Sequence, residues 1–233
     1  VSAPVGIDPQ PFEDEEWDGL FSGEPLDINF QSLRQPITDE WLSLKARPGY
    51  LRLYGKEPTV SLFRQSLLAR RVQSLDIEVE TSVEFDPNSF QQMAGLIAYY
   101  DTQNHYYLRI SHDELAGRSL NIIRTDRARS REVLNEDISL PDDGPVRMKL
   151  RLNKASLQFY YAAGDADWKA IGPELNGAIL SDDYGNLGFT GAFVGICAQD
   201  LTGGCLPADF SCFHYRENAS VETQKLNKAH VSS

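Results

Sequence analysis

The sequence is short of positive charge and has no long apolar run. Its 233 residues contain 22 lysines and arginines against 34 aspartates and glutamates, which gives a net charge of −12. Nucleic acids and anionic membrane surfaces are themselves negative, so this balance argues against either as a partner. No stretch approaches the roughly 20 apolar residues that a membrane-spanning helix needs. We therefore expect no nucleic-acid partner and no membrane partner.

Cysteine is also scarce, with only Cys197, Cys205 and Cys212 in the chain. An odd number of cysteines does not make a disulfide framework. Their spacing, without a nearby histidine pair, does not fit a zinc site. Cys197 and Cys212 lie in apolar runs and are predicted to be buried thiols. Free thiols favour a reducing compartment, so a cytoplasmic location is expected over a secreted one.

Acidic residues are concentrated at the start of the chain. The first 33 residues carry eight acidic side chains and no basic one, which is two thirds of the net charge. The simplest interpretation is a solvated acidic lead-in; the alternative is a segment that binds a basic surface or supplies a calcium ligand. At the other end, residues 218–233 are polar and lack aromatic side chains, which predicts an extension outside the folded domain.

Between these ends, apolar residues recur with a period of two. In Asp76–Phe85 apolar side chains, with one threonine, alternate with mainly acidic ones, which predicts a half-buried strand with an acidic outer face. Arg147–Leu152 alternates in the same way with a basic outer face. Pairing of these two segments would place opposite charges side by side, and we hold that pairing as a hypothesis.

Further strands are predicted at regular intervals, with turn residues between them. Strands separated by such turns indicate an all-β fold, a concanavalin A-like antiparallel β-sandwich or jelly roll. Leu62–Val72 is the best short helix candidate, although the same residues also suit a strand. The predicted strands are Tyr50–Tyr54, Leu96–Tyr100, Tyr106–Ser111, Ser119–Thr125, Ser156–Tyr161, Ala192–Ala198 and Asp209–Tyr215.

The motifs of several common enzyme classes are missing. The sequence has no phosphate-binding loop, dinucleotide fingerprint, paired zinc-binding histidines or nucleophile elbow. Asp182 and Asp183 are interpreted first as turn or cap residues, and only second as ligands. Outward aromatic side chains on a sheet can stack on sugar rings but are also ordinary strand formers; the candidates are Tyr99, Tyr100, Tyr106, Tyr107, Tyr160 and Tyr161.

One loop between two predicted strands is unusual. Residues 86–95 place Phe90 and the amides of Gln91 and Gln92 at a turn where the alternation requires no buried residue. Phe90 either packs under its own loop or is an apolar side chain that inserts into a neighbouring surface or pocket.

Ordered blocks along residues 10–216 resemble one known family. The sequence is similar to the C-terminal β-sandwich of family 43 glycoside hydrolases, which are β-xylosidases that often have α-L-arabinofuranosidase side activity. The blocks that carry the resemblance are Phe30–Pro36 (FQSLRQP), Pro48–Gly55 (PGYLRLYG), Ala69–Arg71, Phe90–Leu96 (FQQMAGL), Tyr99–Asn104 (YYDTQN), Leu180–Tyr184 (LSDDY), Phe189–Gly195 (FTGAFVG) and Ala208–Phe210.

The resemblance implies a two-part protein. In the family a five-bladed propeller carries the catalytic carboxylates, and the sandwich follows it. Residues 1–17 then correspond to a linker from that propeller, residues 18–217 to the sandwich and residues 218–233 to the extension. No catalytic residue of the family can be assigned to this chain, because an acid and a base must be held across one bond. Whether the gene product is an enzyme is therefore left open here.

The resemblance also implies particular site residues. A loop of the family's sandwich reaches the propeller pocket with a phenylalanine, and the matching residues are Phe90, Gln91 and Gln92. Domains of this fold often hold one structural calcium, for which Asp209 and Asp18 are the matching positions. The acidic cluster of relatives is interrupted near Leu20, which argues against calcium. The alternative for Asp209 is a hydrogen-bond acceptor at the end of a strand.

Two functions from different classes follow. The first is an accessory domain of a glycosidase that acts on xylo-oligosaccharides, closing a pocket in its propeller partner and contributing to oligomers. The second is a free-standing carbohydrate-binding, lectin-like module. A complete enzyme within the sandwich is the least favoured, because no carboxylate pair is indicated.

Overall fold

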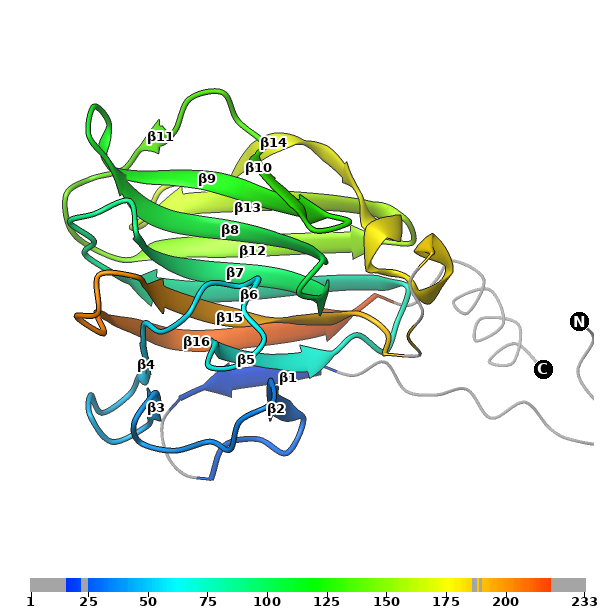
Figure 1. Cartoon of the computed structure of the whole chain (residues 1–233), viewed down its shortest axis with the longest axis horizontal. Coiled ribbons are helices and arrows are strands. Elements are labelled where there is room, and N and C mark those ends of the chain that lie inside the picture. The colour runs from blue at the N-terminus through cyan, green and yellow to red at the C-terminus, as the bar shows by residue number, and fades with distance from the viewer. Residues whose placement is uncertain (1–15, 22–24, 186–187, 189, 219–233) are drawn as a thin grey trace, which may run out of the picture.

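The computed structural model describes residues 16–21, 25–185, 188 and 190–218. Within them, two β-sheets lie face to face, with strands that run in nearly the same direction in both (Figure 1). The predicted all-β, concanavalin A-like sandwich is confirmed. Most of the predicted linker and nearly all of the predicted extension, residues 1–15 and 219–233, lie outside the described residues.

The first sheet, sheet A, has eight strands that pair antiparallel. The last strand described, β16, lies near its middle and pairs with strands from the first 84 residues of the chain. In spatial order the strands are β14 (Lys169–Asn176), β13 (Ser156–Ala163), β12 (Val146–Asn153), β6 (Asp76–Glu84), β16 (Pro207–Glu217), β4 (Leu51–Tyr54) and β3 (Leu42–Ser43), with β1 (Glu16–Leu20) also paired to β16.

The second sheet, sheet B, also has eight strands, and its pairs are antiparallel. Two 3₁₀ helices, η1 (Gly177–Leu180) and η2 (Asp182–Tyr184), lead from sheet A into it. In spatial order the strands are β10 (Arg129–Glu132), β9 (Gly117–Asp126), β8 (Asn104–Asp113), β7 (Gln92–Asp101), β15 (Phe193–Asp200), β5 (Ser66–Arg71) and β2 (Phe30–Ser32), with β11 (Ile138–Ser139) paired to β9.

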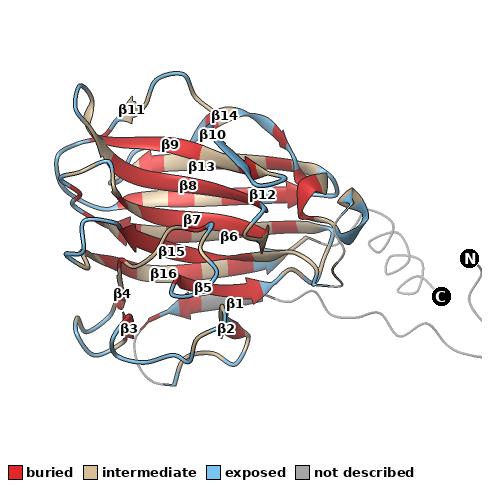
Figure 2. Ribbon diagram, in the orientation of Figure 1, coloured by how far each residue is buried: buried red, intermediate tan, exposed pale blue. Residues whose placement is uncertain are grey.

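The main core lies between the sheets. Strands such as β6 and β12 alternate between buried and partly exposed residues, as a sheet with one wet face requires (Figure 2). Strands β7 and β8 are instead buried along nearly their whole length, because sheet B is covered on both faces. A second apolar cluster, built around Leu67, Ile97, Tyr107 and Cys197, lies apart from the main core.

All seven further predicted strands are present, most of them a few residues longer than expected. The helix alternative for Leu62–Val72 is wrong, since Ser66–Arg71 forms the buried strand β5. Its pairing with β15 explains this, because a sheet partner outweighs weak local propensity. All three cysteines are free thiols; Cys197 is buried as predicted, whereas Cys212 is only partly buried.

The hypothesis that the acidic and basic segments pair is confirmed. Strands β6 and β12 are antiparallel neighbours, with Lys149 opposite Glu80. The Lys149 ammonium lies 2.6 Å from the Glu80 carboxylate and 3.5 Å from that of Glu78.

Exchanging these charges tests what the pair contributes. We expect Lys149→Glu and Glu80→Lys each to lower the free energy of unfolding by about 0.5–1 kcal/mol, because like charges then face each other. The double swap restores the pair and should recover most of the loss, as measured by urea denaturation of the four proteins. Losses that simply add in the double variant would show that the pair contributes nothing specific.

Four of the six tyrosines that the sequence offers as candidates for stacking on sugar rings are buried. Alternation does direct Tyr106 to the main core and Tyr107 to the second cluster, yet both are fully buried. Tyr99 and Tyr100 are also buried. The segment between β4 and β5 contributes to this cover: the Thr59 hydroxyl lies 2.9 Å from His105 Nε2, and the His105 ring stacks on Tyr99. These four tyrosines therefore offer no open face to a sugar ring.

Among the described residues, none of the helices has the length and apolar character to cross a membrane.

Candidate functional site

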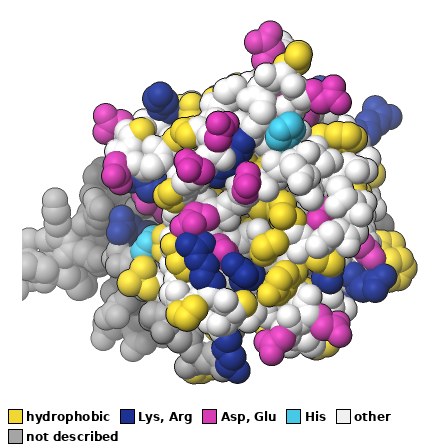
Figure 3. Space-filling model, turned by 90° about the vertical axis from the view of Figure 1, so that its left-hand side faces the viewer, with side chains coloured by type: hydrophobic (Ala, Val, Ile, Leu, Met, Phe, Trp, Pro, Cys, Tyr) yellow, Lys and Arg dark blue, Asp and Glu magenta, His cyan; other side chains and the backbone are white. Residues whose placement is uncertain are grey.

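Three loops meet at one end of the sandwich, on the left of Figure 1. They are the β6–β7 loop, the β8–β9 turn and the β15–β16 loop. Strand β7 pairs with both β8 and β15, and Gln92 at its start lies opposite Asp200 at the end of β15, so these loops lie at the same end of the sheet. Each loop exposes a large apolar side chain: Phe90 is 68 % exposed, Leu115 99 % and Leu201 46 %. Figure 3 looks onto this end and shows hydrophobic side chains among acidic and basic ones.

The backbone around Phe90 is fixed although its side chain is exposed. Its carbonyl accepts a hydrogen bond from the Ser111 hydroxyl at 3.3 Å. The Ser89 carbonyl accepts the Gln92 N–H at 3.0 Å, and the Ser89 hydroxyl accepts the Gln91 N–H at 3.2 Å. Of the two sequence interpretations of Phe90, the exposed apolar side chain matches the structure. A fixed backbone with a free ring is what insertion into a neighbouring pocket requires.

The two glutamines predicted beside Phe90 differ in their surroundings. Gln91 is partly exposed at the loop surface. Gln92 is only 5 % exposed: its Oε1 accepts the Asn88 N–H at 2.9 Å, and its Nε2 lies 3.4 Å from Asp200 Oδ2. The structure therefore places Phe90 and Gln91 at the surface, while the Gln92 amide is occupied by bonds within the protein.

The predicted calcium position at Asp209 is occupied by arginines. Asp209 accepts hydrogen bonds from Arg52 at 2.7 and 2.8 Å and from Arg47 at 2.9 Å. Burial opposes its charged form, but these bonds outweigh burial and hold the pKa of Asp209 below its ordinary value. Two guanidinium groups that already neutralise the carboxylate repel a further cation.

Asp18, the second predicted calcium ligand, lies elsewhere on the sheet. It stands opposite His214 of β16, whereas Asp209 stands opposite Arg52. Five positions along one strand separate the two pairs by roughly 15 Å. In the described ranges no group of three or more His, Cys, Asp or Glu side chains could hold a metal ion. These residues do not fit a shared calcium site, and the strand-end acceptor interpretation matches Asp209.

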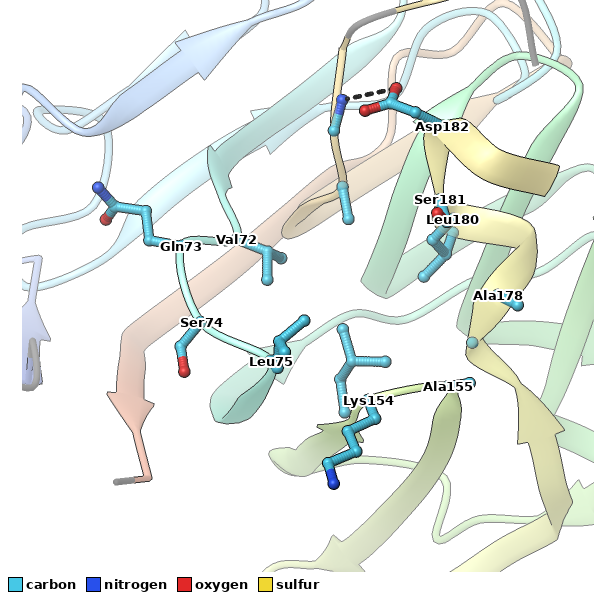
Figure 4. A pocket seen from close by; sticks show the side chains of 14 residues that line it. Val72, Gln73, Ser74, Leu75, Lys154, Ala155, Ala178, Leu180, Ser181 and Asp182 are labelled. Carbon is cyan, nitrogen blue, oxygen red and sulfur yellow. Dashed lines mark hydrogen bonds between the residues drawn. The ribbon is translucent and has the colours of Figure 1, made fainter. Parts of the chain in front are cut away.

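Two cavities flank the ends of the fold. One, of about 480 Å³, adjoins the Phe90 end and is lined by Trp41, Lys56, Arg64 and Leu201, among others. The other, also about 480 Å³, lies at the opposite end, between the β5–β6 connection and the 3₁₀ helices (Figure 4).

Asp182 in the second cavity has a structural role. Its carboxylate accepts the Tyr100 hydroxyl at 2.6 Å and the N–H groups of Thr190 and Gly191, the second of which is drawn in Figure 4. The Tyr100 bond is the main reason that the pKa of Asp182 lies below its ordinary value. Ser181 caps η2 by accepting the Asp183 N–H. Asp182 and Asp183 form the first turn of η2, as the turn interpretation expects, while the cap is Ser181.

Comparison with known proteins agrees with this architecture. Residues 20–216 match the family described as the β-xylosidase C-terminal concanavalin A-like domain. The chain belongs to this family. The resemblance drawn from the sequence blocks to family 43 glycoside hydrolases is thereby confirmed.

Named relatives support the assignment. The chain is 44 % identical to a β-xylosidase of Bacillus subtilis over 84 % of its own length and 38 % of that protein. It is 37 % identical to xylosidase/arabinosidase 43B of Humicola insolens over 93 % of its length and 41 % of the relative. The crystal structure of xylan β-1,4-xylosidase from Bacillus halodurans superimposes with a TM-score of 0.86 at 41 % identity, covering 93 % of this chain and 42 % of that one.

The chain thus spans about two fifths of the length of these relatives. The remaining part of each relative has no counterpart in this sequence.

Proposed function

We propose that this chain is the accessory C-terminal domain of a glycosidase that acts on xylo-oligosaccharides, as a β-xylosidase with possible α-L-arabinofuranosidase activity. Its partner is an N-terminal five-bladed propeller that carries the catalytic carboxylates. The Phe90 loop closes the propeller's sugar pocket, and the domain's surface aids assembly of the whole enzyme and of its oligomers. Membership of the family and the share of its relatives that it spans support the partner.

The exposed ring of Phe90 is the observation that carries the pocket-closing role. An aromatic ring held on a fixed backbone can cover a short pocket without a further ordering cost when substrate binds. Covering the pocket excludes water and strengthens the electrostatic interactions made with the transition state. Gln91, beside it at the surface, is placed to hydrogen-bond a sugar hydroxyl.

Phe90→Ala in the full-length protein, with the propeller attached, tests this role. We expect kcat/KM for a short aryl β-xyloside to fall about 10- to 100-fold, the equivalent of about 1.5–3 kcal/mol of lost apolar contact. The melting temperature should stay nearly constant, because Phe90 is 68 % exposed.

Phe63→Ala is the matched control. Phe63 is 72 % exposed on the connection between β4 and β5, so the same truncation is made at a different loop. It should leave kcat/KM unchanged. An unchanged kcat/KM for Phe90→Ala, or an equal fall in both variants, would remove Phe90 from the sugar site.

The alternative function, a free-standing carbohydrate-binding module, has fewer candidate residues in the structure. Of the six candidate tyrosines, four are buried, and Tyr160 and Tyr161 are only partly exposed. The nearby Trp168 ring is covered by Arg147 and Lys149, at 5.0 and 4.6 Å from its centre. We expect no binding heat when xylobiose is titrated into this chain alone. A saturable heat at millimolar sugar would revive the alternative.

A further inference from the structure

Asp200 is a buried carboxylate bound by neutral groups. It is 5 % exposed and stands at the end of β15, beside the Phe90 loop. Its Oδ1 accepts the Thr202 N–H at 2.9 Å and the Thr202 hydroxyl at 2.6 Å. Its Oδ2 accepts the Leu206 N–H at 2.9 Å and faces Gln92 Nε2 at 3.4 Å. Burying a carboxylate is costly unless hydrogen bonds replace the lost water, and here four donors do so.

These donors come from two different loops. Thr202 and Leu206 belong to the β15–β16 loop, whereas Gln92 begins β7 at the end of the Phe90 loop. A backbone bond joins the same two loops, since the Leu201 N–H donates to the Gln91 carbonyl at 3.2 Å. A second bond, from the Asp200 N–H to the Lys56 carbonyl at 2.9 Å, ties the end of β15 to the connection between β4 and β5. Asp200 therefore connects the interior of one loop to the base of the other.

Gln92 links Asp200 to the Phe90 loop, because its side chain contacts both. Through its Oε1 it accepts the N–H of Asn88, two residues before Phe90. On the other side, the Ser111 hydroxyl lies within hydrogen-bond distance of the carbonyls of both Phe90 and Gln92, at 3.3 and 2.9 Å. The loop is thus held at Asn88, at Phe90 and at Gln92, and the Phe90 side chain is left free.

We propose that Asp200 and Gln92 are positioning residues, which hold the Phe90 loop in the one orientation that lets the ring enter the propeller's pocket. The inference rests on the proposed function; it adds Asp200, which the family resemblance does not assign, and gives Gln92 a positioning role in place of contact with the sugar. Asp200 fixes the amide of Gln92, and the fixed amide holds the loop at Asn88. A loop ordered in advance avoids the entropy cost of ordering when the sugar binds.

The charge state of Asp200 suits this role. Burial opposes ionisation, but the bonds from Thr202, Leu206 and Gln92 outweigh it and hold the pKa of Asp200 below its ordinary value. The carboxylate is therefore an acceptor on both oxygens over the neutral pH range. Each Asp200 oxygen accepts from two donors, so the NH₂ group of an asparagine would face two N–H or O–H groups and accept from neither. An asparagine at this position would therefore break the link between the β15–β16 loop and Gln92.

The first test is a double-mutant cycle in the full-length protein. Gln92→Met keeps the length and burial of the side chain but removes its bonds to Asn88 and Asp200. We expect it to lower kcat/KM for a short xyloside about three- to tenfold, because the ring is then held less well. In the Phe90→Ala background the same change should cause no further loss. A merely structural role would give losses that add.

The second test reads the loop itself. Gln92→Met and Asp200→Asn should speed amide hydrogen exchange at Asn88 and Leu201 at least tenfold, and leave the central strand β7 unchanged. Asp182→Asn, which alters a carboxylate that fixes a loop at the opposite end, is the matched control and should change neither exchange at Asn88 nor kcat/KM.

The outcomes separate the two ideas. If Phe90→Ala lowers kcat/KM but Gln92→Met leaves both kcat/KM and exchange unchanged, or its loss adds to that of Phe90→Ala, the positioning inference is overturned and the proposed function stands. If Phe90→Ala leaves kcat/KM unchanged, the proposed pocket-closing function is wrong, and the positioning role of Asp200 and Gln92 is wrong too.

Discussion

Replacing Asp137 with alanine is expected to lower the free energy of unfolding by about 3–5 kcal/mol, because it leaves three buried donors without their shared acceptor and the buried Arg109 paired only with the half-exposed Glu132. Arg109 of β8 has a side chain only 5 % exposed, and its guanidinium lies 2.9 Å from the Asp137 carboxylate. Asp137 also accepts the Ser119 hydroxyl at 2.6 Å and the Asn121 amide at 2.7 Å. One substitution thus removes the acceptor of three buried donors on the outer face of sheet B.

The same carboxylate gives stability a defined pH dependence. Burial opposes its ionisation, but the bonds from Arg109, Ser119 and Asn121 outweigh burial, so the pKa of Asp137 lies below its ordinary value. In the acidic range below that ordinary value the unfolded chain binds a proton that the folded chain does not. The contribution of Asp137 is therefore complete at neutral pH and is lost as the pH falls through its folded pKa.

Urea denaturation at pH 7 and at decreasing pH measures both effects. Asp165→Ala, at an exposed turn, is the control and should change the free energy of unfolding by less than about 0.5 kcal/mol. Asp137→Ala should also have a flatter dependence of stability on pH below pH 5. A loss below about 1 kcal/mol would mean that Glu132 and water replace the bonds of Asp137, and would contradict the stabilising role given to this carboxylate.

Replacing Asp209 with alanine is expected to cost about 2–3 kcal/mol, since it removes three charge-assisted hydrogen bonds from a largely buried site. The loss is smaller than at Asp137 because Arg47 and Arg52 have side chains 34 % and 24 % exposed and regain water. Arg47 also keeps its ion pair with Glu84 at 2.9 Å and its stacking on the Tyr50 ring.

Chelation separates this ion-pair role from the calcium role that the family resemblance implied. If Asp209 stabilises the fold through arginines, the melting temperature of the chain should be the same in EDTA and in millimolar calcium, and Asp209→Ala should lower it equally in both. A rise of several degrees on adding calcium that Asp209→Ala abolishes would contradict the structure and restore a metal site there.

The strands could be predicted from the sequence because one face of each is buried. Alternation in Asp76–Phe85 and in Arg147–Leu152 gave both the strands and their partner, since opposite charges on the outer faces favour the pairing that the structure has. The prediction failed where both faces are covered. Tyr107 points outward by alternation, yet a second cluster buries it, and local periodicity carries no signal for that cover.

Some site residues could be predicted from the sequence and others could not. Phe90 could be singled out because a large apolar side chain at a polar turn breaks the local pattern. Asp200 and Asp137 could not, since the partners that give each its role, Gln92 and Arg109, lie 108 and 28 residues away in sequence. For Asp209 the sequence left two roles open, calcium ligand and strand-end acceptor. The hydrogen bonds that Arg47 and Arg52 donate to it favour the second, and these bonds are visible only in the structure.

The central claim is that Phe90 contacts sugar in a pocket built by another domain. A single 4-fluorophenylalanine at position 90 reports on this directly by ¹⁹F NMR, in the full-length protein and in this chain alone. Titration with a sulfur-linked xylobiose, which resists hydrolysis, should shift the resonance in the full-length protein and leave it unchanged in the isolated chain. A resonance that does not move when the full-length protein is saturated with the ligand would contradict the account.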